Sequence, residues 1–267
     1  MSATVARLAA LLGTPVAEAA PLSGGDLSTV LRLRLADGAI RIAKIGAPAE
    51  IEADMLRAIA ATGAPAPRVV AAEEDLLVLT ECARGGRLAD AWPALADALT
   101  LLHAPRDESY GWDRDHVFGP VAILNARRVR WPDFWADNRL RCHLPHLPPA
   151  LARRVERLAD ALEALLPERP PPALLHGDLW GGNILVADRA VTGLIDPACA
   201  IGDREVDVAM LTPFDSPPPR FFDALALDPG WRARLPVYRL WPLLVHLRLF
   251  GSSYAGSIAA DLESIGF

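Results

Sequence analysis

The sequence predicts an α+β protein with two lobes: a small N-terminal lobe with an antiparallel β-sheet plus one helix, and a larger, mainly helical C-terminal lobe. Residues 28–45 alternate apolar and polar side chains around Asp37-Gly38, which is typical of a β-hairpin. From residue 93 onward, apolar residues instead recur at helical spacing over long segments. Two glycines in "CARGGRL" break the pattern, so we place the N-terminal lobe at 1–82 and the C-terminal lobe at 83–267.

The elements of each lobe follow from these periodicities. In the N-terminal lobe, a helix over 48–63 is indicated by Pro48 at its start and Gly63 at its end. The other N-terminal elements are a first helix within 1–15 and strands at 28–37, 39–45, 68–75 and 76–81. In the C-terminal lobe we expect helices over 93–104, 148–167 and 235–266, with short strands between 171 and 211.

Composition excludes several classes of protein. The net charge of −6, without a basic block, argues against a nucleic-acid-binding surface. No stretch of about 18 uninterrupted apolar residues is present, so we expect no membrane span. The three cysteines are widely spaced, which disfavours a disulfide framework or a zinc site and fits a reducing cytoplasm.

The segment "LLHGDLWGGNILVADRAVTGLID" carries the strongest chemical signal. Asp178 and Asn183 have the spacing of the kinase catalytic loop, in which an aspartate faces the substrate hydroxyl and an asparagine binds magnesium. "NILVAD" and "VTGLID" predict a hairpin that brings Asp196 beside Asn183 as a second oxygen ligand for Mg²⁺. Each residue alone could equally cap a turn or belong to an ordinary loop, but their order and spacing together favour a kinase.

Lys44 is the only lysine of the chain; every other basic side chain of this kind is an arginine. It falls on the third predicted strand, where a kinase places the lysine that contacts phosphates. Glu52, in the first turns of the next helix, would hold Lys44 extended, with Glu50 as a competitor. Gly24 and Gly25 in "SGGD" would let the backbone approach phosphates, although this motif alone more often marks a hairpin turn.

Several motifs together resemble the fructosamine kinase (ketosamine kinase) family. They are "LLHGDLWGGN", "LIDPACAIGDREVDVAML" and "PVYRLWPLLVHLRLFGSSY", and the resemblance extends over most of the chain. That family has a protein-kinase-like fold, which it shares with aminoglycoside phosphotransferases. The resemblance implies ATP-dependent phosphorylation of the C3 hydroxyl of a ketoamine, whose product is unstable and releases the amine, as in deglycation.

The resemblance also implies roles for individual residues. Asp178 would be the base or hydroxyl-orienting residue, and Trp180 either stacks on the substrate sugar or walls the pocket. The segment "LTEC" would be the hinge that meets adenine through its backbone. The implied ligand sets are Asn183 and Asp196 for Mg²⁺, and Lys44, Glu52, Gly24, Gly25, Thr80, Glu81 and Cys82 for ATP.

Two further expectations concern the surroundings of this loop. Relatives usually have serine where Gly181 stands, so we expect the "WGGN" variant to loosen the loop. Arg204, Glu205 and Asp207 lie in an apolar setting, and we expect them to form a buried ion-pair network that supports the loop.

Two alternatives stay open. The same chemistry could act on an aminoglycoside or a small amino alcohol, although Asp261 and Glu263 are few carboxylates for a cationic antibiotic. The chain could also be a catalytically inactive kinase-like binding module, but Lys44, Asp178 and Asp196 are all present.

Overall fold

The computed structural model describes residues 2–22, 28–46 and 48–267. The chain forms two compact units, each described by itself. The first unit comprises Met1–Ala91 and Gly182–Pro197, and the second comprises Trp92–Gly181 and Ala198–Phe267. The chain therefore re-enters the first unit at Gly182 and leaves it again after Pro197. The lobe boundary at residue 82 stays a prediction.

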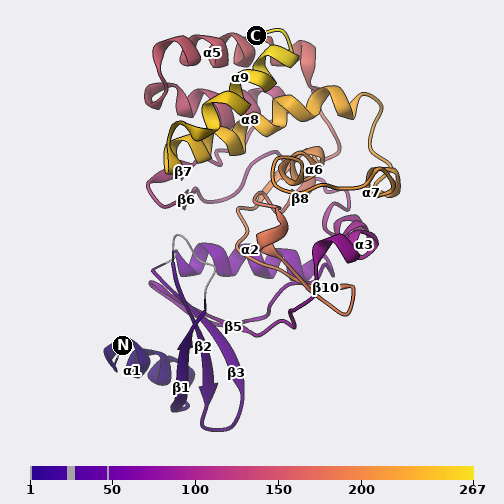
Figure 1. Ribbon diagram of the computed structural model, residues 1–267. Helices are drawn as coiled ribbons and strands as arrows, with labels where there is room; N and C mark the ends of the chain where they lie inside the picture. Colours follow the sequence, from indigo (N-terminus) through magenta and orange to yellow (C-terminus); the bar gives the residue numbers. More distant parts are fainter. Residues whose placement is uncertain (1, 23–27, 47) are drawn as a thin grey trace. The chain divides into compact units, whose positions relative to one another are not determined.

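The first unit is built on a five-stranded antiparallel sheet with the strand order β1-β2-β3-β5-β4 (Figure 1). The predicted hairpin around Gly38 is present, and its register places Lys44 opposite Val30 on one side and Leu77 on the other. The sheet and its helices are β1 (Val16–Pro21), β2 (Thr29–Leu35), β3 (Ile40–Ile45), β4 (Val69–Glu73), β5 (Leu76–Thr80), α1 (Ser2–Leu12) and α2 (Ala49–Ala61).

Each face of this sheet packs against a different helix. Leu8 of α1 joins a buried cluster with Leu31 of β2 and Val78 of β5. Leu56 of α2 joins a second cluster with Leu77, the neighbour of Val78 in β5. Because successive side chains of a strand point to opposite faces, α1 and α2 cover opposite faces of the sheet. Lys44 lies opposite Leu77 and therefore faces α2.

A second hairpin, β9 (Ile184–Ala187) and β10 (Ala190–Leu194), completes the first unit as the sequence predicts. It is anchored on the segment after β5. Gly86 N–H donates to the Val186 carbonyl at 2.8 Å, and Thr192 Oγ1 donates to the Ala83 carbonyl at 2.5 Å. These two bonds fix where the ends of the hairpin, Asn183 and Ile195, lie within the unit.

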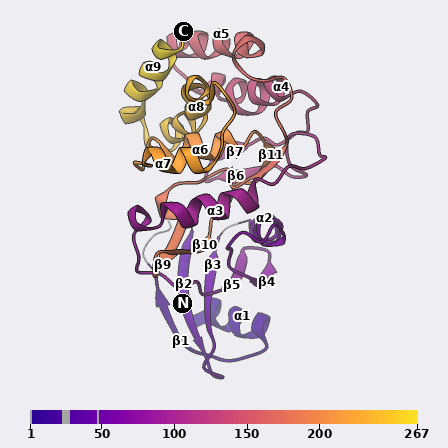
Figure 2. The same ribbon diagram turned by 90° about the vertical axis from the view of Figure 1, so that its right-hand side faces the viewer.

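The second unit is mainly helical, in agreement with the sequence (Figure 2). Helix α6 packs against α8, and α8 packs against α9. Its helices are α3 (Trp92–Leu102), α4 (Trp131–Trp135), α5 (Pro149–Leu165), α6 (Glu205–Leu211), α7 (Pro219–Ala224), α8 (Trp231–Phe250) and α9 (Ala255–Ser264), with short 3₁₀ turns that include η5 (Ser252–Tyr254).

The core of the second unit is aromatic. Trp131, Phe134 and Trp135 are fully buried. The Trp135 ring meets the Tyr238 ring edge-on at 4.9 Å between centroids. Two short antiparallel pairs lie in the same unit: β6 (His116–Phe118) with β7 (Val121–Ile123), and β8 (Ala173–Leu175) with β11 (Ala200–Gly202).

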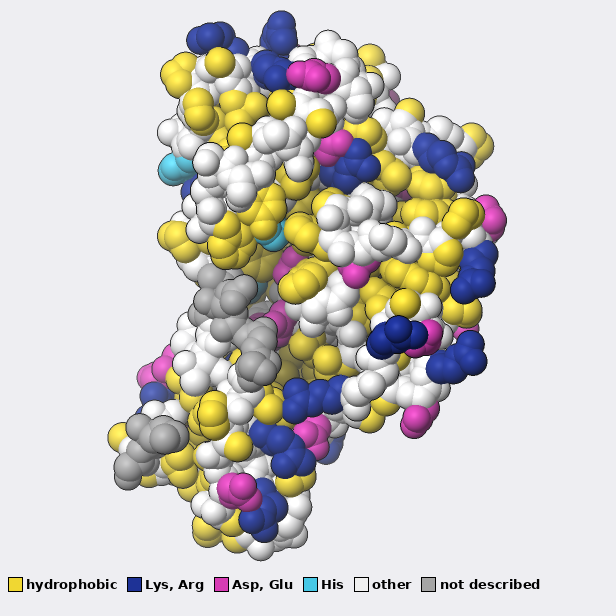
Figure 3. Space-filling model, in the orientation of Figure 1, with side chains coloured by type: hydrophobic (Ala, Val, Ile, Leu, Met, Phe, Trp, Pro, Cys, Tyr) yellow, Lys and Arg dark blue, Asp and Glu magenta, His cyan; other side chains and the backbone are white. Residues whose placement is uncertain are grey.

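The surface of the described residues carries mixed charge. In Figure 3 basic and acidic side chains are interspersed over the visible face. Among the helices of the described residues, none is both long and apolar enough to span a bilayer.

Candidate active site

Lys44 is the centre of a buried ion cluster in the first unit. Its Nζ lies 2.6 Å from Glu52 Oε1, 2.6 Å from Glu52 Oε2 and 2.8 Å from Asp196 Oδ1. Only 8% of the Lys44 side chain is exposed. The predicted Lys44–Glu52 contact is therefore present, because α2 covers the face of the sheet to which Lys44 points. Glu50, the competitor, is exposed on α2.

Electrostatics keep this lysine charged. Burial lowers the pKa of Lys44, but the negative charges of Glu52 and Asp196 outweigh it and raise the pKa above its ordinary value. The Asp196 side chain is the more accessible partner, 36% exposed against 5% for Glu52. Asp196 also has a left-handed backbone, with φ of 56°. Non-glycine residues rarely adopt this conformation, and such strain gathers at functional sites.

The β9–β10 hairpin brings Asn183 and Asp196 together, as the sequence predicts. Ile195 N–H donates to the Asn183 carbonyl at 3.0 Å, so the chain flanking Asp196 lies beside Asn183. No group of three or more His, Cys, Asp or Glu side chains within 2–22, 28–46 and 48–267 is arranged to hold a metal ion. A pair of oxygen ligands suits Mg²⁺, which is commonly held by one or two protein oxygens together with substrate phosphates.

The residues predicted to form the hinge, Thr80, Glu81 and Cys82, lie at and just after the end of β5. Thr80 N–H already donates to the Arg68 carbonyl at 2.9 Å, so that group is engaged within the sheet. The Glu81 carboxylate is bidentate with Arg32, at 2.6 and 3.2 Å. Cys82 Sγ lies where a Cβ on Gly193 would come within 2.8 Å, which explains a glycine in β10. Their adenine-binding role stays a prediction, and Gly24 and Gly25 lie outside the described residues.

The Asp178 loop belongs to the second unit, where Asp207 of α6 holds its backbone. The Asp207 carboxylate accepts hydrogen bonds from His176 N–H and Gly177 N–H, both at 2.8 Å, and lies 2.9 Å from His103 Nε2. Burial raises the pKa of Asp207, but the bond with His103, the nearby histidine charges and the Gly177 N–H together lower it below the ordinary value. His176 Nδ1 accepts a hydrogen bond from Asp178 N–H at 3.3 Å, so its ring supports the backbone of the loop.

Gly177 makes the tight approach that this loop requires. Its φ is +80°, and a Cβ there would lie 2.0 Å from the Ala198 carbonyl oxygen. Ala198 N–H in turn donates to the His176 carbonyl at 2.8 Å. The β8–β11 pairing therefore holds the start of the Asp178 loop against the segment that follows Asp196.

Past Asp178, the loop is fixed by Asp215, which corrects the expectation that Gly181 loosens it. Gly181 N–H donates to Asp215 Oδ2 at 2.8 Å. A Cβ on residue 181 would lie 2.5 Å from Asp215 Oδ1, so the glycine makes room for the carboxylate. Trp180 is 40% exposed, and its ring lies 6.1 Å from that of Phe214.

The expected network of Arg204, Glu205 and Asp207 is wrong in its pairing. Glu205 is bidentate with Arg234, at 2.7 Å through Nε and 2.5 Å through Nη2, and Arg204 donates instead to the carbonyls of Leu225 and Ala226. Of these three residues, Asp207 is the one whose hydrogen bonds reach the loop backbone directly. On a helix, residues two apart face different directions, so Glu205 and Asp207 meet different partners.

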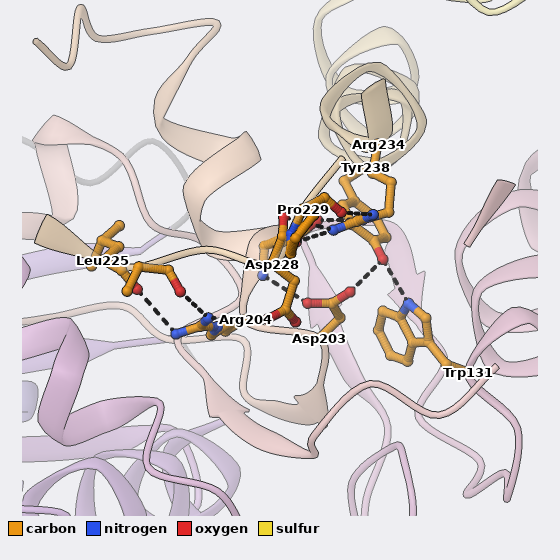
Figure 4. Close-up of polar contacts among 10 residues, drawn as sticks. Trp131, Asp203, Arg204, Leu225, Asp228, Pro229, Arg234 and Tyr238 are labelled. Atoms are coloured by element: carbon orange, nitrogen blue, oxygen red, sulfur yellow. Dashed lines mark hydrogen bonds and ion pairs between the residues drawn. The ribbon is translucent and has the colours of Figure 1, made fainter. Parts of the chain in front are cut away.

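Next to this segment lies a separate buried chain of hydrogen bonds (Figure 4). Trp131 Nε1 donates to Tyr238 Oη at 2.9 Å, and Tyr238 Oη donates to Asp203 Oδ2 at 2.7 Å. Asp203 Oδ1 accepts from Glu205 N–H at 3.0 Å. These hydrogen bonds connect α4 and α8 to the start of α6, the helix that carries Asp207.

Sequence reasoning missed two residues that shape this region. The bond between His103 and Asp207 links positions more than 100 residues apart. Asp215 follows α6 without any motif around it. The one available signal was the unusual glycine at 181, which implies that another group fills the space of the missing side chain.

The comparisons with known proteins agree on one family. The family model described as fructosamine kinase matches residues 2–265. A probable ketoamine kinase of Thermus thermophilus is 34% identical over 249 residues, covering 90% of this chain and 91% of that protein. One of Staphylococcus aureus is 30% identical, covering 94% and 93%.

Solved structures extend this agreement to the fold. A crystal structure named "putative fructosamine-3-kinase" from Thermobifida fusca has a TM-score of 0.90 and 33% identity, covering 99% of each chain. An aminoglycoside phosphotransferase in complex with ADP and hygromycin B has a TM-score of 0.70 at 18% identity, covering 99% of each chain, which shows the fold alone. The fold is protein-kinase-like, and the chain belongs to the fructosamine kinase family.

Proposed function

We propose that this chain is an ATP-dependent kinase that phosphorylates the C3 hydroxyl of a ketoamine, a fructosamine or ribulosamine. The observation that carries the proposal is the buried Lys44–Glu52–Asp196 cluster in a member of this family. A buried lysine clamped by one carboxylate beside a second, more accessible one is the arrangement that phosphoryl transfer requires.

The cluster suits a nucleotide triphosphate. All three N–H donors of Lys44 are used, two by Glu52 and one by Asp196. A phosphate oxygen can therefore reach Lys44 only when Asp196, the more exposed partner, gives way. Asp196 and Asn183 would then hold Mg²⁺, which supplies charge stabilisation of the phosphate oxygens. The hinge backbone at Glu81 and Cys82 would meet the adenine.

Asp178 would accept the proton of the acceptor hydroxyl. Its backbone is held through the Asp207 contacts with the two residues before it, and through the Asp215 contact three residues after it. These contacts hold the backbone that carries the Asp178 side chain, and phosphoryl transfer depends on such positioning.

The tail disfavours the aminoglycoside alternative. Asp261 is buried and pairs with Arg239, so of the two carboxylates only the exposed Glu263 is open to a cation. A polycationic antibiotic requires carboxylates that are not already neutralised in this way.

An ATP-consumption assay tests the proposal with fructoselysine, ribuloselysine and kanamycin in parallel. We expect turnover with one or both ketoamines, and loss of about 10²- to 10⁴-fold in kcat in Asp178→Asn. Nucleotide binding should persist in that variant, measured by titration with ATP. Turnover of kanamycin alone would reject the ketoamine assignment, and wild-type kcat in Asp178→Asn would remove Asp178 from its role.

A further inference from the structure

A continuous strip of aromatic rings leads away from the Asp178 loop within the second unit. Trp180 lies 6.1 Å from Phe214, and Phe214 lies 5.0 Å from His246, between ring centroids. His246 then meets Phe250 at 5.4 Å and Tyr254 at 5.0 Å. These five residues, here called the aromatic strip, come from the Asp178 loop, the turn after α6, helix α8 and η5.

The strip is accessible at both ends. Trp180 is 40% exposed and Phe250 is 50% exposed, while Phe214, His246 and Tyr254 are half-buried between them. His246 and Phe250 are four residues apart on α8 and so share one face of the helix. Because Trp180 lies two residues after Asp178, the strip begins at the proposed site of phosphoryl transfer.

A carboxylate stands at the Trp180 end of the strip. Asp215 follows Phe214 in the chain and bonds Gly181, the residue after Trp180, at 2.8 Å. The segment Trp180-Gly181 therefore contacts the segment Phe214-Asp215 twice. The two rings are in contact, and the two following residues share a hydrogen bond. The bond to Gly181 uses Oδ2, and Oδ1 lies on the side where residue 181 has no side chain.

We propose that the aromatic strip and Asp215 form the subsite for the amine-bearing part of the acceptor. The protonated amine of a ketoamine would lie beside Asp215, and an apolar or aromatic substituent on that amine would lie along the rings. This inference rests on the proposed function and deepens it, because it assigns the class of amine that the enzyme prefers.

The chemistry of the strip fits such a ligand. A ketoamine carries its amine on the carbon next to the sugar carbonyl, so a sugar at Asp178 leaves the amine near the Trp180 end. Aromatic faces attract cations and apolar groups alike. His246 Nδ1–H donates to the Pro242 carbonyl at 2.7 Å, and burial lowers the pKa of His246, which favours the neutral ring.

The first test compares two ketoamines, the fructose derivatives of methylamine and of 2-phenylethylamine. We expect wild-type kcat/KM to favour the phenylethyl compound, and Phe250→Ala to lower this ratio about two- to tenfold, the value of one aromatic contact. The matched control is Val129→Ala, because Val129 is a 67% exposed apolar residue of the same unit outside the strip. An equal ratio in Phe250→Ala and Val129→Ala would overturn the proposal.

A second test needs no turnover. Titration calorimetry with 2-phenylethylammonium should show saturable binding to wild-type protein and to Val129→Ala, and binding about two- to tenfold weaker in Phe250→Ala. If binding is absent from the wild type, or is unchanged in Phe250→Ala, the proposal that the aromatic strip binds the substituent of the amine is overturned. If no ketoamine is phosphorylated, the proposed function fails, whereas the strip is still judged by this titration.

The role of Asp215 is tested by charge. Asp215→Asn keeps an oxygen that can accept from Gly181 N–H but removes the negative charge. We expect it to lower kcat/KM for the amine-linked phenylethyl ketose about tenfold relative to the ether-linked analogue, which carries no positive charge, as for loss of a charged hydrogen bond. A ratio equal to that of wild type would remove Asp215 from amine recognition.

Discussion

The Asp215 carboxylate occupies the space that a side chain at residue 181 would need, and Gly181 leaves that space open. The Asp215 carboxylate accepts the Gly181 N–H at 2.8 Å and lies where a Cβ would approach within 2.5 Å. The glycine that seemed to loosen the loop after Asp178 instead admits the residue that fixes it.

The first prediction follows from this fit. Gly181→Ala should displace the carboxylate, break the hydrogen bond and lower kcat, because Asp178 lies three residues before Gly181. In Asp215→Ala the space is empty, so adding Gly181→Ala should cost nothing further. The two substitutions should therefore couple by about 0.5–3 kcal/mol in the free energy of unfolding, measured by urea denaturation of both single variants and the double variant. If the two substitutions instead change the free energy of unfolding additively, Gly181 and Asp215 do not depend on each other and the prediction is wrong.

Lys44 leads to the second prediction. Lys44→Arg should lower kcat/KM about 100-fold, because the planar guanidinium cannot aim its donors at Glu52 and Asp196 within the space of a compact ammonium. The measurement is steady-state kinetics at varied ATP concentration. The matched control is Arg34→Lys, an exposed exchange in the neighbouring strand β2 that should change little. Near-normal activity in Lys44→Arg would mean that the lone lysine is accidental.

The Lys44–Glu52 contact could be predicted from sequence because it depends on local periodicity, whereas the Lys44–Asp196 contact joins residues 152 apart and could not be. A strand of period two and a helix that starts directly after it determine which side chains meet, so Lys44 and Glu52 were paired correctly. The β9–β10 hairpin was predictable for the same reason, since Asn183 and Asp196 lie at its two ends. Such contacts join neighbours along the chain.

The partners of Glu205, Asp207 and Asp215 could not be predicted, because they depend on the packing of distant elements. Glu205 meets Arg234 on α8, and Asp207 meets His103 just after α3. Charge alone suggested that Arg204 would pair with its neighbours, but the helix turns their side chains apart. Periodicity within one element says nothing about which other element will cover it.

The third prediction concerns magnesium. Asp196→Asn should raise the Mg²⁺ concentration that gives half-maximal activity by about tenfold or more, because one anionic ligand of a two-oxygen site is lost. Asp188→Asn serves as the control, since Asp188 is exposed at the turn of the same hairpin. A Mg²⁺ requirement unchanged in Asp196→Asn would exclude Asp196 as a metal ligand.

The fourth prediction concerns Asp207, whose carboxylate holds the backbone of the Asp178 loop. Asp207→Asn should lower the free energy of unfolding by about 1–3 kcal/mol at pH 7, because an amide has one acceptor oxygen and leaves a buried N–H of His176 or Gly177 without its partner. Asp160→Asn is the control, because Asp160 is an exposed partner of Arg141 and should cost at most about 1 kcal/mol.

The effect of Asp207 should depend on pH with a definite sign. Its folded-state pKa is lowered, so the charged carboxylate stabilises the fold above the unfolded-state pKa of about 3.9. This stabilisation is lost as the pH falls through the lower, folded-state pKa, where the native carboxylate itself takes up a proton. Urea denaturation of wild type and Asp207→Asn between about pH 3 and 7 should show a constant difference above about pH 5 that narrows below about pH 4. A difference that grows on acidification would mean that the Asp207 carboxylate destabilises the loop it contacts.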